Sequence, residues 1–328
     1  MPSPTRILIT GGAGFIGSHL AQRLHARGDD VVLVDDLSTG RIENIEPLLD
    51  HGDGRCRLVR CSIEQALRDD YALFDGVDQV FHLAAAVGVK LLVDDSVAML
   101  RNNVAQTLAL LDASADRDLT VLIASSSEVY GRNADLPLRE DAELIYGPTT
   151  SLRFSYAMSK ALDEQAALMY HHKDRLRAVI VRLFNTIGLR QVGRYGMVVP
   201  RFVDAAVKGE PLTVYGDGSQ TRCFIDVRDT VRALVTLMDD STHTGELFNI
   251  GSNRELTIDQ LADRVIALAG SDSEKQYVPF DQVYSPQFED MQRRVPSVDK
   301  LRSATGFEPK YALDDTLTEL IAAARADS

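Results

Sequence analysis

The first 185 residues alternate short apolar runs with longer stretches in which apolar residues recur every three or four positions. A short apolar run between turn residues is typical of a buried strand, and the wider spacing is typical of a helix with one buried face. Because strands alternate with helices, the pattern predicts an α/β fold built on a doubly wound parallel sheet. Strands are predicted at 6–10, 30–35, 57–60, 78–82, 120–125 and 177–183, and the clearest helices at 15–27, 96–115 and 156–173.

From residue 186 onward glycine and proline become denser and the predicted elements shorter. We expect a smaller, interleaved C-terminal α/β lobe (186–328) beside the first domain (1–185), with later returns to the main sheet around 223–250. Helices are predicted at 200–208, 226–238, 257–268 and 314–326, and strands at 212–215 and 247–250.

A glycine-rich turn joins the first predicted strand to the first helix, in Thr10-Gly11-Gly12-Ala13-Gly14-Phe15-Ile16-Gly17. Gly11 permits a tight turn, Gly14 lets the backbone approach a pyrophosphate, and Gly17 lets the helix pack closely on the sheet. The free N–H groups and the dipole of the helix N-terminus then face the phosphates. Asp35 ends the second strand, where its carboxylate can accept both ribose hydroxyls of NAD and would repel a 2′-phosphate. This stretch predicts a Rossmann unit that binds NAD through Gly11, Gly14, Phe15, Ile16, Gly17, Asp35 and Asp36.

Composition and charge narrow the possible partners. The formal net charge of the 328 residues is −13, which argues against a nucleic-acid or anionic-membrane partner. Cys56, Cys61 and Cys223 form no Cys-x-x-Cys pair, so neither a disulfide framework nor a metal site is expected, and the reducing cytoplasm is the expected compartment. Residues 1–5 do not form a signal peptide, and no apolar run approaches membrane length.

Small residues follow the fourth predicted strand in Phe81-His82-Leu83-Ala84-Ala85. They let a nicotinamide ribose approach the backbone, so Leu83, Ala84 and Ala85 are predicted cofactor contacts, although an ordinary small-residue strand end fits equally well. His82 is interpreted as a structural histidine, and Lys90 either reaches a cofactor phosphate or is a solvated surface lysine.

The candidate catalytic residues lie between 125 and 160. Ser126 and Glu128 follow the fifth strand, whereas Tyr156 and Lys160 share one face of the next helix. A free tyrosine has a pKa of about 10, and an adjacent ammonium together with the positive nicotinamide of NAD+ favours its phenolate. We predict that Tyr156 takes a proton from a substrate hydroxyl as hydride leaves the same carbon, and that Ser126 shares the hydrogen bond of that hydroxyl.

Together these motifs resemble the nucleotide-sugar epimerase/dehydratase family of the extended short-chain dehydrogenases/reductases, over nearly the whole chain. Further matches are Asn103, Arg182-Leu183-Phe184-Asn185 and the segment 212–226. The resemblance implies a tightly held NAD+ that is recycled within each turnover and contacts Asn103, Tyr156 and Lys160. It also implies a UDP- or dTDP-sugar substrate and a homodimer. Cys61-Ser62-Ile63 departs from the family, which usually has an aspartate in the adenine pocket.

The same resemblance implies the residues at the substrate end. Asn185 and Arg222 are expected to hold the diphosphate, and Val214 and Tyr215 to flank the base. Arg294 is expected at the nucleotide or sugar end, and Ser126 and Ser127 beside the sugar.

The residue after Ser127 discriminates between reactions. Simple epimerases usually have Thr or Ser where this chain has Glu128, whereas decarboxylases and dehydratases have Glu as an acid/base near C5. Ser127 replaces the aspartate of the dehydratases, so 4,6-dehydration is disfavoured. UDP-glucuronate decarboxylases share Ser127-Glu128 and Arg294, but the motifs at 156–160 and 196–199 depart from theirs, and an arginine of the second motif is missing.

A new arginine, Arg194, lies two residues before Gly196. We hypothesise that Arg194 holds the C6 carboxylate of a UDP-hexuronate in an orientation that does not allow loss of CO2. Return of hydride to C4 would then be faster than cleavage of the C5–C6 bond. The favoured prediction is therefore a UDP-glucuronate 4-epimerase that forms UDP-galacturonate. The alternative is a UDP-glucuronate decarboxylase, and a UDP-glucose 4-epimerase, a 4,6-dehydratase or a non-catalytic dinucleotide sensor is less favoured.

Overall fold

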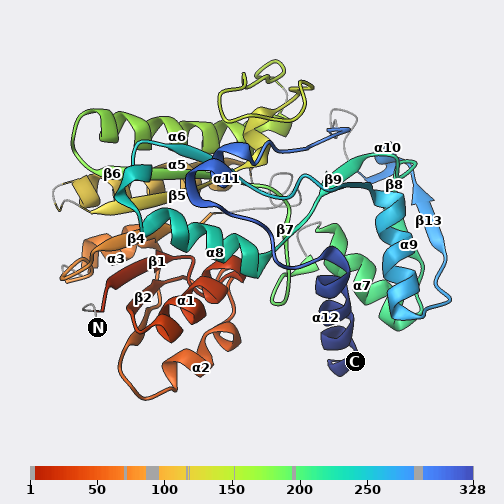
Figure 1. The fold of residues 1–328 in the computed structure, drawn as a ribbon, viewed down its shortest axis with the longest axis horizontal. Coiled ribbons are helices and arrows are strands. Elements are labelled where there is room, and N and C mark those ends of the chain that lie inside the picture. The colour runs from red at the N-terminus through yellow and green to blue at the C-terminus, as the bar shows by residue number, and fades with distance from the viewer. Residues whose placement is uncertain are drawn as a thin grey trace.

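The computed structural model describes residues 4–69, 72–85, 96–115, 117, 119–150, 152–193, 197–283 and 291–327. Its centre is a parallel sheet of seven strands in the order β11-β6-β5-β4-β1-β2-β3 (Figure 1). Apart from β11, this is the strand order of a doubly wound dinucleotide-binding sheet, so the predicted fold class is confirmed. The strands are β1 (Arg6–Thr10), β2 (Asp30–Val34), β3 (Cys56–Val59), β4 (Gln79–His82), β5 (Thr120–Ser126), β6 (Arg177–Leu183) and β11 (Leu247–Ile250).

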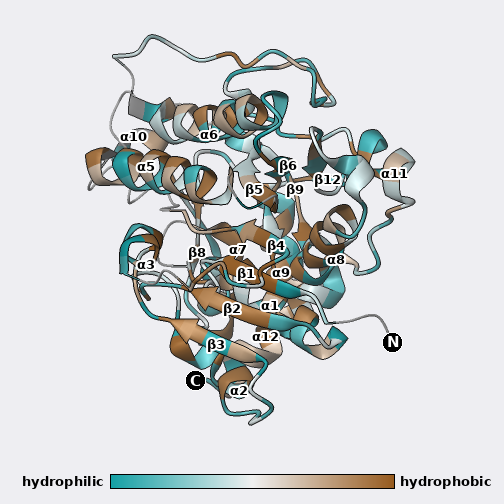
Figure 2. Cartoon of the chain, turned by 90° about the vertical axis from the view of Figure 1, so that its left-hand side faces the viewer, coloured by the Kyte–Doolittle hydropathy of each residue, from teal (hydrophilic) through white to brown (hydrophobic). Residues whose placement is uncertain are grey.

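Helices cover both faces of this sheet, because neighbouring residues of a strand point to opposite sides. Ile7 and Ile9 of β1 belong to the core under α1 (Phe15–Arg27) and α8 (Val227–Met238). Leu8 belongs to the core under α3 (Ile63–Asp69), α5 (Ser96–Ala115) and α6 (Ser155–His172). Apolar strands buried on both faces appear as the brown centre of the molecule in Figure 2.

A smaller lobe lies at the carboxyl side of the sheet. Its core is formed by α7 (Val198–Lys208), α9 (Ile258–Ala269) and α12 (Leu313–Ala326). Three two-stranded sheets complete this region, and their short strands were mostly not predicted. They pair β8 (Leu212–Tyr215) with β13 (Lys275–Val278), β9 (Thr221–Cys223) with β12 (Glu255–Thr257), and β7 (Thr186–Ile187) with β10 (Ile225–Asp226).

The two parts of the chain are interleaved. After the first strands of the smaller lobe, α8 packs against the central sheet and β11 extends its edge beside β6. The division at residue 185 stays a prediction. Short helical segments occupy the connections: η1 (Ile42–Asn44), α2 (Glu46–Leu49), η2 (Ser127–Tyr130), η3 (Leu152–Phe154), η5 (Ser241–His243), α10 (Phe280–Val283) and α11 (Asp299–Thr305). Within the described ranges, every helix is too short or too polar to cross a bilayer.

Candidate active site

A cavity of about 760 Å³ opens at the carboxyl ends of the central strands and extends to β8 of the smaller lobe. Such an edge is where open α/β sheets bind ligands. Among the described residues, every predicted site residue except Val214 lines this cavity, although the role of each stays a prediction. They are Gly11, Gly14, Phe15, Ile16, Gly17, Asp35, Asp36, Leu83, Ala84, Ala85, Asn103, Ser126, Ser127, Glu128, Tyr156, Lys160, Asn185, Tyr215, Arg222 and Arg294.

The glycine turn is closely packed against its neighbours. Gly11 has a φ of +72°, and a Cβ there would lie 2.9 Å from the backbone nitrogen of Ala84. A Cβ on Gly17 would lie 2.0 Å from the carbonyl oxygen of Gly11. The absence of side chains at these positions leaves a cradle at the N-terminus of α1, which fits the diphosphate of a dinucleotide.

Asp35 closes one side of this cradle. Its carboxylate accepts hydrogen bonds from the backbone N–H groups of Ala13 (2.9 Å) and Leu37 (2.8 Å). Burial raises the pKa of Asp35, and these backbone hydrogen bonds oppose the rise. The carboxylate is therefore held in a fixed orientation at the end of β2, where the ribose of NAD is predicted to bind.

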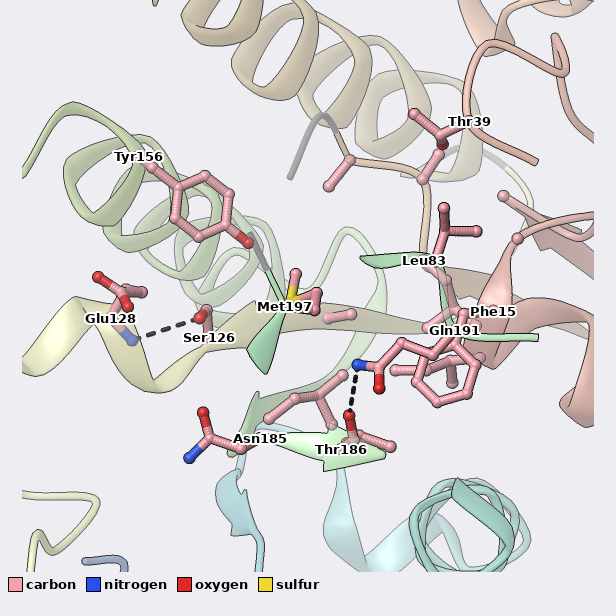
Figure 3. A pocket seen from close by; sticks show the side chains of 18 of the residues that line it. Phe15, Thr39, Leu83, Ser126, Glu128, Tyr156, Asn185, Thr186, Gln191 and Met197 are labelled. Atoms are coloured by element: carbon pink, nitrogen blue, oxygen red, sulfur yellow. Dashed lines mark hydrogen bonds between the residues drawn. The ribbon is translucent and has the colours of Figure 1, made fainter. Parts of the chain in front are cut away.

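Tyr156, Ser126 and Glu128 lie on one side of the pocket, opposite Phe15 and Leu83 (Figure 3). Tyr156 enters from the first turn of α6, and Ser126, at the end of β5, lies on the same side of the pocket. This arrangement brings the predicted base and its predicted partner together where the cavity meets the strand ends.

Tyr156 and Lys160 have different surroundings in the structure. Burial and the negative charge of Glu128 raise the pKa of Tyr156, although the nearby Ser126 hydroxyl opposes the rise. The ammonium of Lys160 donates a hydrogen bond to Asp163, with 3.1 Å between Nζ and Oδ2. That Lys160 and the positive charge of oxidised nicotinamide together favour the phenolate of Tyr156 stays a prediction.

Glu128 is held between two arginines. Arg294 donates to Oε1 at 2.6 Å, and Arg153 donates to Oε2 at 2.9 Å. Burial opposes ionisation of Glu128, but the charges of Arg294, Arg153 and Arg222 outweigh it and lower its pKa to about 2. The carboxylate is thus ionised at neutral pH.

Arg153 is a residue that the motif-based prediction missed. It lies in η3, is buried and contacts the ring of Phe154, 5.6 Å from its centroid. Its place three residues before Tyr156 is the one sequence signal that could have identified it.

The nucleotide end of the cavity is formed by the smaller lobe. Arg222 is buried and donates to the carbonyl oxygens of Thr221 and Met291, and Asn185 donates to the carbonyl oxygen of Cys223 at 3.0 Å. These bonds hold both side chains at the cavity wall.

The prediction that the side chain of Val214 lines the site is wrong. Val214 is fully buried in the core of the smaller lobe, and its neighbours Thr213 and Tyr215 line the cavity instead. The reason is the alternation of side chains along β8. Two predicted residues, Lys90 and Arg194, lie outside the described residues.

The fold and this cavity define an extended short-chain dehydrogenase/reductase that binds a dinucleotide. The chain belongs to the NAD dependent epimerase/dehydratase family, whose sequence model matches residues 7–251. Family membership confirms the predicted resemblance and the NAD cofactor. The chain is therefore an enzyme of this family.

Three proteins illustrate the range of reactions among its relatives. UDP-N-acetyl-alpha-D-glucosaminuronate decarboxylase of Bacillus cytotoxicus is 41% identical over 317 residues, which cover 96% of each chain. UDP-glucuronic acid decarboxylase 1 of Danio rerio is 35% identical, covering 96% of this chain and 72% of the relative. The structure of UDP-glucuronic acid 4-epimerase from Bacillus cereus, with UDP-glucuronic acid and NAD, aligns with a TM-score of 0.87, 28% identity and coverage of 99% and 100%. These relatives favour the decarboxylase alternative over the 4-epimerase that the sequence motifs favoured.

Proposed function

We propose that the protein is an NAD-dependent decarboxylase of a UDP-hexuronate, either UDP-glucuronate or its 2-acetamido analogue. The observation that carries the proposal is the pair of guanidinium groups around Glu128. Arg153 and Arg294 bring two positive charges to one carboxylate, so the cluster retains charge for a second anion. Nε of Arg294 is also buried without a hydrogen-bond partner among the described residues, as expected if a ligand oxygen binds there.

The residues at the cavity suit the first half of this reaction. Gly11, Gly17 and Asp35 would hold NAD, which when bound supplies the oxidant that converts the C4 alcohol of the sugar into a ketone. Tyr156 takes the hydroxyl proton, and Ser126, on the same side of the cavity, orients the oxygen.

Loss of CO2 follows from the position of the new ketone. The C4 carbonyl is β to the C6 carboxylate, so the C5–C6 bond breaks with its electron pair moving into a C4 enolate. The hydroxyls of Tyr156 and Ser126, which line one side of the cavity, would donate to this enolate oxygen. Glu128 is ionised and orients the two arginines, so the proton that C5 receives comes from water.

We propose decarboxylation over epimerisation because a relative that is named as a decarboxylase is 41% identical to this chain and aligns with 96% of it. The 4-epimerase stays a second candidate, supported by the likeness to the Bacillus cereus enzyme. If the protein is a 4-epimerase, a positively charged residue such as Arg194 would have to hold the C6 carboxylate so that CO2 is not lost.

The test is to incubate the purified protein with UDP-glucuronate and with UDP-N-acetylglucosaminuronate, and to follow CO2 and sugar products by NMR. CO2 together with a UDP-pentose or UDP-4-keto-pentose supports the proposal. A C4 epimer without CO2 would overturn it in favour of the epimerase. UDP-glucose, which has no carboxylate, is the control and should give no CO2.

We also propose a homodimer formed through the outer face of α5 and α6. The two helices pack side by side (Figure 2). Each carries exposed apolar residues. An apolar patch of this kind is unfavourable in contact with water, and a second copy of the same face would cover it. The exposed residues are Val97, Leu100, Leu108, Leu162 and Met169.

The Leu162→Asp variant should shift the protein from dimer to monomer in analytical ultracentrifugation, because the charge would be buried in the shared face. Leu268→Asp is the matched control, since Leu268 is exposed on α9 rather than on α5 or α6. A dimer that survives Leu162→Asp would place the interface elsewhere.

A further inference from the structure

Lys160 is paired with an acidic residue that the mechanism above does not use. Asp163 lies three residues further along α6, and the two side chains are 2% and 1% exposed. Nζ of Lys160 is 3.1 Å from Oδ2 of Asp163. Burying two charges is costly unless they meet each other and further hydrogen bonds, so the surroundings of this pair decide what it does.

A chain of hydrogen bonds leads from the cofactor edge of the sheet to α5, beside this pair. The backbone N–H of Ala84 donates to Oγ1 of Thr10 at 3.2 Å, and this hydroxyl lies 2.7 Å from Nδ1 of His82. Nε2 of His82 lies 3.0 Å from Oγ1 of Thr107. The chain thus connects β1, β4 and α5.

The protons in this chain can be assigned from its chemistry. Burial, and then the charge of Lys160, lower the pKa of His82 to about 3, so the ring is neutral. Thr10 already accepts from Ala84 and gives its own proton to Nδ1 of His82, which leaves the ring proton on Nε2 to be donated to Thr107. This confirms the interpretation of His82 as a structural histidine.

The chain ends on α5. The hydroxyl of Thr107 accepts from His82 and donates its one proton to the carbonyl oxygen of Asn103 at 2.9 Å. The nearby Thr107 hydroxyl also lowers the pKa of Asp163. The hydrogen bond that holds the Asp163 carboxylate is therefore the one from Lys160.

We infer that Asp163 is a positioning residue that fixes the Lys160 ammonium and offsets its charge, thereby setting the pH range in which Tyr156 can act as a base. The inference rests on the proposed function, in which Tyr156 takes the substrate proton. The charged and titratable groups around Asp163 are Lys160, Tyr156 and Glu164 on α6, with the last paired to Arg182 of β6, and His82 on β4.

The direction of the effect follows from charge. The negative charge of Asp163 contributes to raising the pKa of Tyr156. An asparagine keeps the shape and the hydrogen bonds but removes that charge, so the unopposed ammonium of Lys160 should favour the phenolate.

The test compares wild type with Asp163→Asn as NAD-loaded holoenzymes. After mixing with UDP-glucuronate, the rate of NADH appearance at 340 nm is measured in a single turnover as a function of pH. The midpoint of the rise in rate should move about one unit towards lower pH in the variant. Asp141→Asn is the matched control, because Asp141 is an exposed partner of Arg139, and it should leave the midpoint unchanged. A variant midpoint that coincides with wild type would overturn the inference.

A second measurement does not depend on turnover. A held, buried ammonium exchanges its protons slowly, so Lys160 should give an observable ¹⁵N-ammonium NMR signal that is identified by its loss in Lys160→Arg. That signal should disappear in Asp163→Asn, and its persistence unchanged would contradict the positioning role. If wild type oxidises no UDP-sugar, the proposed function fails while this readout still tests Asp163.

Should Asp163→Asn fail to fold, Asp163→Ser serves in its place. This variant also removes the carboxylate that lies 3.1 Å from Nζ of Lys160. It should move the midpoint in the same direction, and an unmoved midpoint would count against the inference.

Discussion

The two ends of the cavity are built in different ways. At the cofactor end, Gly11, Gly17 and Ala84 approach one another so closely that a single Cβ would collide with the backbone. At the predicted sugar end, the buried residues Arg153 and Arg294 form a charged cluster with the partly buried Glu128. We expect the cofactor end to select its ligand by shape and backbone donors, and the other end to select by charge. Substitutions at the two ends should therefore impair different properties of the protein.

The largest effect is expected from Gly17→Ala, at the cofactor end. The added Cβ would lie 2.0 Å from the carbonyl oxygen of Gly11, so α1 must move away from the turn. We expect loss of bound NAD and a fall of about 3 kcal/mol in the free energy of unfolding. Nucleotide released from the purified protein and urea unfolding measure the two quantities.

Gly209→Ala is the control for that prediction. Gly209 also has a positive φ (+70°), but no atom lies within 4 Å of its ideal Cβ. Gly209→Ala should lower the free energy of unfolding by about 1 kcal/mol and leave the amount of bound NAD unchanged. Equal loss of NAD in both variants would mean that close packing at the turn is not what holds the cofactor.

Tyr156→Phe tests the region between the two ends, because Tyr156 lies on the same side of the pocket as Ser126 and Glu128 (Figure 3). Turnover should fall by about 10²–10⁴-fold, the weight of a positioned acid–base group, while NAD content and folding stay normal. Near-normal turnover would show that another group takes the proton.

The smallest effect concerns the pH dependence of stability at the sugar end. The pKa of Glu128 is lowered from 4.5 to about 2, so its ionised form stabilises the folded state above pH 4.5, and this contribution is lost as the pH falls towards 2. The difference in unfolding free energy between wild type and Glu128→Gln should therefore narrow over that interval.

Urea unfolding of both proteins between pH 6 and about 2.5 measures this difference, within the range where such carboxylates titrate. Glu210→Gln, at an exposed position, should show no comparable pH dependence. A constant gap between wild type and Glu128→Gln would mean that the two arginines do not control this carboxylate.

The sequence pattern predicted most of the central fold because strands that are buried on both faces of the sheet are continuous runs of apolar residues. The predicted strands 6–10 and 177–183 coincide with β1 and β6, and the predicted helix 15–27 coincides with α1. The strands β7, β9 and β10 escaped prediction because two or three residues are too few to show a period. Val214 was misplaced for a related reason, since a one-residue error along a strand reverses the side that a side chain faces.

The candidate site could be predicted where local motifs define it. The glycine turn and the pair Tyr156 and Lys160 each lie within one short segment. The contacts of Glu128 with Arg153 and Arg294 join residues 25 and 166 positions apart, and no spacing rule connects them. Asp163 is close to Lys160 in sequence, but only the structure shows that both side chains are buried and hydrogen-bonded to each other.

The ion pair between Glu128 and Arg294 also has a consequence for synthesis. During translation the glycine turn, Tyr156 and Lys160 leave the ribosome well before Arg294, and the sheet itself waits for β11 to take its edge. A nascent chain therefore acquires the residues predicted to hold the dinucleotide before the second arginine of the charged cluster has been made. A product released before residue 294 would lack one of the two guanidinium groups around Glu128.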